Sequence, residues 1–382
     1  MINPASIPLS LYIHVPWCIR KCPYCDFNSH QAPAELPEKI YIEALLNDLE
    51  QELVHTQSRS ITSIFIGGGT PSLFTADSIQ ALLSGIKQRC VLDDNAEITL
   101  EANPGTFEQQ RFNDYRLAGI NRLSIGIQSY NSEHLNVLGR VHDSNEAINA
   151  AKIAHDAGFD NFNLDLMFGL PAQTTEQALD DLKQAISCKP SHLSWYQLTL
   201  EPNTLFHHNP PTLPDHEAQW AIQQAGQTLL EQSGYAQYEV SAYASAGRKC
   251  EHNVNYWEFG DYIGIGAGAH GKLTNSDGVI TRHQKYRQPK QYLQQAKAGS
   301  FRSSSKILQP NELPFEFMLN ALRLKSGIDS TVYQKRTAQP ISSIATLLEQ
   351  AKSLGLLQQE GQKIACTEQG WRFLDDTLSL FL

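Results

Sequence analysis

Three cysteines near the N-terminus carry the strongest chemical signal of the 382-residue chain. Cys18, Cys22 and Cys25 fall within eight residues in a CxxxCxxC pattern, directly after a run of β-forming residues. Three thiolates so close together can converge on one small inorganic core, for which they are soft ligands. Three cysteines on a four-iron cube leave one iron open to a substrate or cofactor, so the spacing predicts a [4Fe–4S] cluster. Structural zinc takes four protein ligands, so zinc completed by His14 or His30 is the alternative.

A glycine run at the end of the second predicted strand is the next candidate. The residues are Gly67-Gly68-Gly69-Thr70-Pro71. Glycines allow a ligand to approach the backbone, so carbonyls can accept from an ammonium group and amides can donate to a carboxylate. No GxxxxGK-Ser/Thr pattern follows, which argues against a phosphate-binding loop. The alternative is an ordinary tight turn between a strand and a helix.

The elements that must position these residues follow a strand-then-helix rhythm through the first half of the chain. Thr75, Asp143 and Thr174 are predicted helix N-caps, the last two within capping boxes. Six strand–helix units favour an α/β fold with a parallel sheet flanked by helices. A partial (β/α)6-type barrel with its chemistry at the C-terminal strand ends is the favoured layout, and a doubly wound open sheet competes with it. The predicted strands are 11–15, 63–66, 97–101, 122–127, 161–167 and 192–198.

The regular alternation of predicted strands and helices ends beyond residue 200, which indicates further domains. We predict an α/β core at 1–240, a barrel extension with a linker at 241–305, and a small C-terminal domain at 306–382. Two helical patterns followed by a hairpin that turns at Glu360-Gly361 make this last domain helical and winged-helix-like.

The composition argues against several classes of protein. Forty acidic against thirty basic residues give a net charge of −10, which argues against a nucleic-acid-binding protein. No window approaches 18 consecutive apolar residues, so no transmembrane segment is predicted. The first ten residues lack the basic and apolar regions of a signal peptide, and seven cysteines, an odd number, do not suit a disulfide framework. A cytoplasmic protein is therefore expected.

The cysteine pattern resembles that of the radical S-adenosylmethionine (SAM) superfamily, whose hallmark is CxxxCxΦC with an aromatic residue before the last cysteine, here Tyr24. The resemblance implies that residues 1–240 are a radical SAM core. In that superfamily SAM chelates the open iron, and an electron from the reduced cluster cleaves its sulfonium to a 5′-deoxyadenosyl radical. A reductant for the cluster is implied as a partner.

Further motifs resemble the oxygen-independent coproporphyrinogen III oxidase group over nearly the whole chain. They lie at 11–18, 67–71, 101–104, 124–129 and 163–171. The resemblance implies that Tyr12, Gly68 and Glu101 contact the SAM on the cluster. It also implies a neighbouring pocket for a second SAM, lined by Tyr24, Gly69, Thr70, Gln128, Arg140 and Asp165.

Two features separate the chain from the oxidase and resemble the HemW-type heme chaperone family. The oxidase continues its triplet as CxxxCxxCxC, whereas Phe27 stands at the last position here. His252-Asn-Val-Asn-Tyr256-Trp257 matches the HNxxYW motif of the chaperones. The resemblance implies that heme binds and passes to heme-requiring acceptor proteins. His252 is the predicted heme-associated residue, with Tyr256 and Trp257 against the porphyrin. The oxidase reaction, decarboxylation of coproporphyrinogen III to protoporphyrinogen IX, is the alternative.

A basic stretch at 278–311 has no acidic residue and seven cations. It is either a solvated surface or a site for heme propionates or an acidic partner, because separated cations attract anions at range. Reversing the charges of Lys285 and Arg287 distinguishes the two interpretations, because a merely solvated surface predicts no change in heme or partner affinity.

Overall fold

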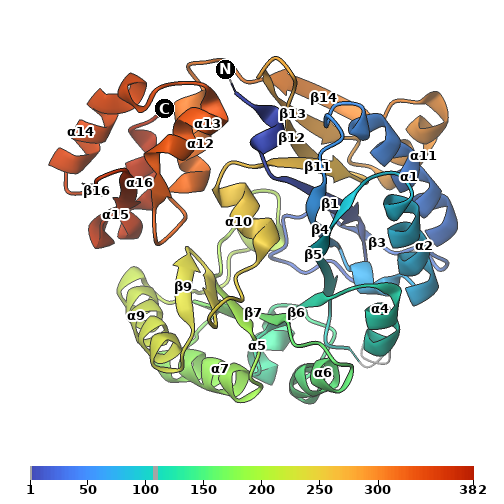
Figure 1. Ribbon diagram of the computed structural model, residues 1–382. Coiled ribbons are helices and arrows are strands. Elements are labelled where there is room, and N and C mark those ends of the chain that lie inside the picture. The colour runs from blue at the N-terminus through green and yellow to red at the C-terminus, as the bar shows by residue number, and fades with distance from the viewer. Residues whose placement is uncertain (1, 106–110) are drawn as a thin grey trace.

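The structure is a computed structural model that describes residues 2–105 and 111–382. Within these residues the core is one twelve-stranded sheet of order β14-β13-β12-β11-β1-β4-β5-β6-β7-β8-β10-β9 (Figure 1). The strands from β11 through β1 to β8 are parallel, and antiparallel pairs extend the sheet at both ends. The strand bounds are β1 Leu9–Val15, β4 Ile61–Gly68, β5 Leu92–Ala102, β6 Arg122–Gln128, β7 Phe162–Phe168, β8 His192–Gln197, β9 Ala236–Glu239, β10 Ala242–Ala244, β11 Asp261–Ile265, β12 His270–Thr274, β13 Ile280–Lys285 and β14 Arg302–Ile307.

All six predicted strands are present, as β1, β4, β5, β6, β7 and β8. Most of their residues are buried, on both faces of the sheet, as expected of strands in a parallel sheet covered on either side. The parallel run also contains β11, which pairs with β1 through Leu9↔Asp261 and Ile13↔Ile265. That pairing joins the start of the chain to a segment some 250 residues later, so local periodicity could not reveal it.

Helices follow one another round the outside of the curved sheet, the arrangement of a partial barrel (Figure 1). The three predicted N-caps are confirmed, because the Thr75, Asp143 and Thr174 side chains each accept from a backbone amide of the first turn. Asp143 and Thr174 stand in full capping boxes. The helices are α1 Glu38–Leu53, α2 Ala76–Lys87, α4 Phe112–Ala118, α5 Ser132–Val137, α6 Ser144–Asp156, α7 Thr175–Ser187, α8 Leu205–His208, α9 His216–Gln232, α10 Glu251–Trp257 and α11 Pro289–Ala298.

The C-terminal residues build a second apolar core around a small sheet of order β15-β17-β16. The predicted hairpin is confirmed as β16 and β17, with Gly361 at a φ of +60° in the turn between them. Ile7, Phe259 and Ile280 pack into this core from outside the domain, so it is docked on the barrel. Its elements are α12 Leu313–Ala321, β15 Ile328–Asp329, α13 Ser330–Thr337, α14 Ala345–Ser353, β16 Leu357–Glu360, β17 Lys363–Cys366, α15 Glu368–Arg372 and α16 Leu374–Ser379. No helix of the described residues is long and apolar enough to cross a bilayer.

The stretch expected to contain a linker instead continues the sheet as β13, α11 and β14. Lys285 is not part of a solvated surface: it is 1% exposed, and its Nζ lies 2.5 Å from both Asp48 Oδ1 and Glu52 Oε1 of α1. Arg302 of β14 adds a 2.6 Å ion pair with Glu52. These cations therefore fasten the sheet extension to α1.

Candidate functional site

A cavity of about 360 Å³ opens at the C-terminal ends of the central strands and is lined by the cysteine loop. The loop leaves β1 and returns to α1, and its two ends are joined by β2 Trp17–Cys18 and β3 His30–Gln31, which pair in parallel. This pairing holds residues 19–29 as a closed arch over the strand ends.

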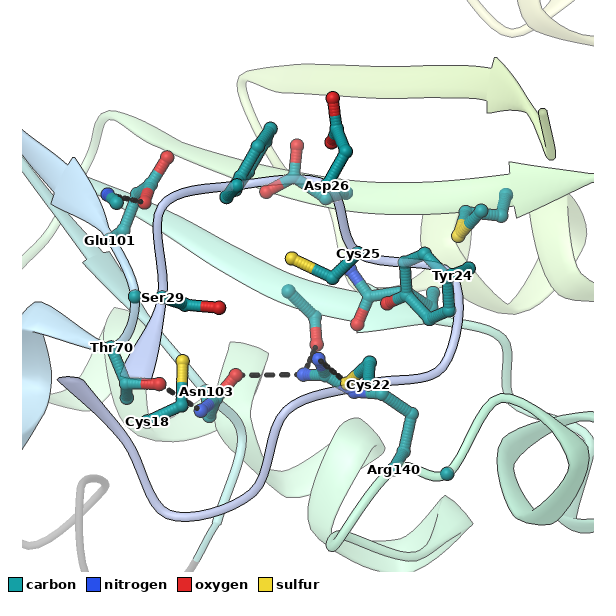
Figure 2. A pocket seen from close by; sticks show the side chains of 18 of the residues that line it. Cys18, Cys22, Tyr24, Cys25, Asp26, Ser29, Thr70, Glu101, Asn103 and Arg140 are labelled. Atoms are coloured by element: carbon teal, nitrogen blue, oxygen red, sulfur yellow. Dashed lines mark hydrogen bonds between the residues drawn. The ribbon is translucent and has the colours of Figure 1, made fainter. Parts of the chain in front are cut away.

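The three cysteines of the loop face the space that it encloses (Figure 2). None of them is in a disulfide, and all are partly exposed. Arg140 donates from Nη1 to Cys22 Sγ at 3.7 Å. Burial raises the pKa of the Cys18 and Cys25 thiols, so a bound cation is needed to hold them as thiolates at neutral pH. Across the described part of the chain, no three His, Cys, Asp or Glu side chains lie close enough together to bind a single metal ion.

The glycine run lets the cysteine loop lie directly on the end of β4. A Cβ on Gly68, whose φ is +117°, would be 2.6 Å from the His14 ring, and one on Gly69 would be 2.5 Å from the Trp17 carbonyl oxygen. The amides of Gly69 and Thr70 donate to the Val15 and Trp17 carbonyls at 2.7 Å. The Gly68 amide donates to Glu101 Oε2 at 2.9 Å. The prediction that these amides would bind a ligand carboxylate is therefore wrong, because all three have partners in the protein.

Two carboxylates of the cavity floor lie on β5 and β7, the strands on either side of β6. Burial, and secondarily the charge of Asp165, raise the pKa of Glu101 to about 7 despite its hydrogen bond from Gly68. Burial also raises the pKa of Asp165, which accepts from Ser124 Oγ at 2.9 Å and from Asn163 Nδ2 at 2.8 Å. Such buried acids in a cavity favour a cationic ligand.

The opposite wall is polar and is held in place by Arg140 (Figure 2). Arg140 Nη2 donates to Asn103 Oδ1 at 2.7 Å and to the Gly126 carbonyl at 2.8 Å. Asn103 in turn donates to Thr70 Oγ1 at 3.3 Å. Gln128 has a φ of +62°, which is uncommon for a residue with a side chain, and its buried Oε1 has no hydrogen-bond partner among the described residues. That orphaned acceptor lies in a cavity wall, where a bound donor would satisfy it.

Comparison with known proteins identifies the family. The chain is 50% identical over 375 residues to the heme chaperone HemW of Escherichia coli, and the aligned residues cover 98% of each chain. The chain belongs to the HemW family. A radical SAM superfamily model matches residues 12–185, and a model of the HemN C-terminal domain matches 308–373.

More distant relatives of the HemW family agree with this. A mitochondrial radical SAM domain-containing protein 1 of Danio rerio is 32% identical and covers 99% of this chain and 87% of its own. The structure of coproporphyrinogen III oxidase (HemN) from Escherichia coli matches with a TM-score of 0.83 at 24% identity, over 99% of this chain and 90% of that one. At that identity the match establishes the fold, an α/β radical SAM barrel with a C-terminal domain.

The structure brings most of the predicted site residues of this HemW-family chain to the first cavity. These are Cys18, Cys22, Tyr24, Cys25, Gly68, Gly69, Thr70, Glu101, Gln128, Arg140 and Asp165. Tyr12 is not among its lining residues: it faces an adjoining cavity, and its hydroxyl lies 2.9 Å from His14 Nδ1.

His252 of the HNxxYW motif does not fit its predicted role as a heme ligand. Its ring is 1% exposed, and burial lowers its pKa to about 3. Its Nδ1 lies 3.0 Å from Ser63 Oγ and its Nε2 lies 3.0 Å from the Tyr256 hydroxyl. Both ring nitrogens are thus engaged, so the imidazole holds the start of α10 against β4 and presents no free nitrogen to iron.

Sequence reasoning did not single out two of the lining residues, Asn103 and Tyr196, and it noted a third, Phe27, only as a departure from the oxidase pattern. Asn103 connects Thr70 to Arg140, and its place directly after β5 is the signal that could have found it. Tyr196, near the end of β8, contacts Gln128 and could have been found by the same strand-end rule. Phe27 is 57% exposed and lines both cavities, which its sequence position alone did not indicate.

Replacing Glu101 by Gln is expected to weaken SAM binding roughly tenfold, about 1.4 kcal/mol. Because the pKa of Glu101 is raised to about 7, the carboxyl group is charged above that pH and neutral below it. Affinity of the native chain for the cationic cofactor should therefore fall between pH 8 and pH 6, and that of Glu101→Gln should stay flat. Isothermal titration at several pH values checks this. If SAM affinity in Glu101→Gln depended on pH as it does in the native chain, Glu101 would not be the group that attracts SAM. Loss of the pH dependence in the exposed control Glu133→Gln would also contradict this role of Glu101.

Proposed function

We propose that the chain is a heme chaperone that binds a [4Fe–4S] cluster, SAM and heme, and delivers heme to acceptor proteins. The observation that carries the proposal is the 50% identity to the heme chaperone HemW over 98% of both chains. Phe27 supports it, because the oxidase group has a fourth cysteine where this chain places an exposed phenylalanine ring.

The residues of the first cavity fit the cluster and SAM. Three unbridged thiols that face one space, one of them bound by a guanidinium, are suited to hold an iron–sulfur cluster through Cys18, Cys22 and Cys25. A bound cluster and SAM would supply one-electron chemistry. The chain itself contributes the arch that covers the site and the Arg140 guanidinium, which donates to Cys22 Sγ.

The first cavity offers several polar side chains that could bind SAM. The Glu101 carboxylate is placed by Gly68 to attract its positive charge, and the unsatisfied Gln128 Oε1 can accept from its hydroxyl or amino groups. Tyr24, Gly69, Thr70, Arg140 and Asp165 line the same cavity, and we assign them to the neighbouring SAM pocket. Tyr12 is assigned a supporting role, since its hydroxyl pairs with His14 behind the glycine run.

Two assays run side by side separate chaperone from oxidase. Anaerobic, cluster-loaded protein is titrated with heme, and the same preparation receives SAM, a reductant and coproporphyrinogen III. The proposal expects stoichiometric heme binding and no protoporphyrinogen IX. Product formed over many turnovers would overturn it, as would a chain that binds no heme.

A further inference from the structure

A second cavity, of about 720 Å³, lies beside the first and shares Asp26, Phe27, Gly68 and Glu101 with it. Its walls come from the cysteine loop, the end of α10, strands β12 and β13, and Asn320 of α12 (elements in Figure 1). Its volume falls in the range of pockets that hold a cofactor-sized ligand. The fold thus places a large chamber between the barrel and the C-terminal domain, next to the cysteine loop.

Aromatic rings dominate one side of this cavity. Tyr256 and Trp257, the last two residues of the HNxxYW motif, line it together with Tyr262, whose ring centroid lies 4.5 Å from that of Tyr256. The exposed Phe27 ring lines it from the cysteine loop. A wall rich in aromatic rings suits a large aromatic ligand, which rings can contact by face or by edge.

His252 of the motif and Asn255, which stands at one of its x positions, explain how these rings are held. His252 bonds Ser63 and Tyr256, as described above, and Asn255 Nδ2 donates to Ser10 Oγ at 2.8 Å and to the Asp261 carbonyl at 2.9 Å. His252 and Asn255 are therefore positioning residues that fix α10 to the sheet. Tyr256 and Trp257 are the part of the motif that faces the cavity.

Two histidines line the cavity, and only one can reach a metal. His14 is 5% exposed, with its ring nitrogens 2.9 Å from the Tyr12 hydroxyl and the Asn28 carbonyl oxygen. His270, at the start of β12, is exposed, and its ring makes no hydrogen bond within the described residues. Partial desolvation of the ring and the charges of Arg282 and Arg287 lower the pKa of His270, which favours the neutral imidazole, with a lone pair available to a metal.

The cations of the cavity differ in whether a carboxylate neutralises them. Lys272 pairs with Asp261 at 3.0 Å, and Arg282 pairs with Glu316. Arg287 lines the cavity with an exposed side chain, and none of the described carboxylates forms an ion pair with it. It is the cation of this wall best placed to meet the carboxylates of a ligand.

We propose that heme occupies this second cavity, with the His270 imidazole as its iron ligand and its propionates toward Arg287. This inference rests on the proposed function and assigns the site of its cargo. It also assigns the HNxxYW motif a different role, as a frame that presents Tyr256 and Trp257 to the porphyrin. Heme there would lie against Phe27, directly behind the loop that carries the cysteines.

The iron ligand is tested with His270→Ala in the full-length, cluster-loaded chain, titrated with heme by absorption spectroscopy. We expect at least tenfold weaker binding and a shifted Soret band, with imidazole added to the buffer restoring the native spectrum. His216→Ala, an exposed histidine outside the cavity, should bind heme as the native chain does. If His270→Ala bound heme with the affinity and spectrum of the native chain, the proposed heme site would be wrong. A native chain that binds no heme would instead overturn the proposed function.

The propionate contact is tested with Arg287→Glu and with heme dimethyl ester, in which both propionates are neutral. Arg287→Glu should weaken heme binding severalfold at low salt and leave binding of the ester unchanged. Lys290→Glu reverses an exposed charge outside the cavity wall and is expected to change neither. Equal losses for heme and its ester, or no loss for heme, would place the propionates elsewhere.

Discussion

Replacing Cys22 by Ser is expected to abolish the iron–sulfur cluster. Iron and sulfide, about four of each per native chain after anaerobic reconstitution, should fall close to zero. A serine hydroxyl is a hard and weakly acidic donor that does not replace a thiolate on iron. The substitution also removes the sulfur that accepts from Arg140 Nη1 at 3.7 Å, so the guanidinium loses one of its partners in the cavity.

Cys188→Ser is the matched control, because Cys188 is also a free, partly exposed cysteine but follows α7, away from the cysteine loop. It should retain native iron and sulfide contents. A Cys22→Ser variant that keeps a full complement of iron would show that the loop cysteines do not hold the cluster. Loss of iron in Cys188→Ser alone would move the site to another part of the chain.

Replacing Lys285 by Met is expected to destabilise the fold by roughly 3–5 kcal/mol, the usual cost of removing one partner from a buried ion pair. The Lys285 ammonium lies between Asp48 and Glu52, and none of the three is more than 2% exposed. Methionine keeps most of the side-chain volume, so the loss reflects Asp48 left without its cation and Glu52 left with Arg302 alone. The midpoint of urea unfolding measures the effect.

Lys290→Met is the control for this variant, since Lys290 is an exposed cation on the neighbouring α11 and its loss should change stability by about 0.5 kcal/mol or less. A loss below about 1 kcal/mol for Lys285→Met would mean that the buried cation contributes little.

The same cluster makes an acid-sensitive contribution to stability. Burial opposes ionisation of Glu52, but hydrogen bonds from Arg302 and Lys285 outweigh it and lower the pKa of Glu52 to about 2. A carboxyl whose pKa is lower in the folded state stabilises the fold above its ordinary pKa of about 4.5, and this stabilisation is lost as the pH falls towards 2. The decrease in the free energy of unfolding from pH 6 to pH 3 should therefore be smaller for Arg302→Met than for the native chain. Urea unfolding at the two pH values measures this difference.

The fold was largely predictable because its signals are local. Buried strands read as short apolar runs, and Thr75, Asp143 and Thr174 mark helix starts through hydrogen bonds within a single turn. The pairing of β11 with β1 and the burial of Lys285 against Asp48 depend on contacts between residues more than 200 positions apart. Neither contact can be predicted from the residues that are adjacent to it in the sequence.

The candidate site was predictable in its residues but less so in their roles. The cysteines and the acids near the strand ends, both singled out from the sequence, line one cavity, since parallel strands end at one edge. The motif around His252 was misleading, because the sequence cannot show that Ser63 and Tyr256 engage both ring nitrogens. The glycine amides were misleading in the same way, since their partners come from the cysteine loop and from Glu101.

If Cys18, Cys22 and Cys25 hold a four-iron cluster with one iron open to SAM, the cluster must sense the cofactor. Electron paramagnetic resonance of the dithionite-reduced protein, recorded with and without SAM, measures this. We expect a reduced-cluster signal whose g-values shift when SAM is added, because SAM would ligate the open iron. A protein that contains zinc in place of iron, or a cluster signal that SAM leaves unchanged, would contradict it.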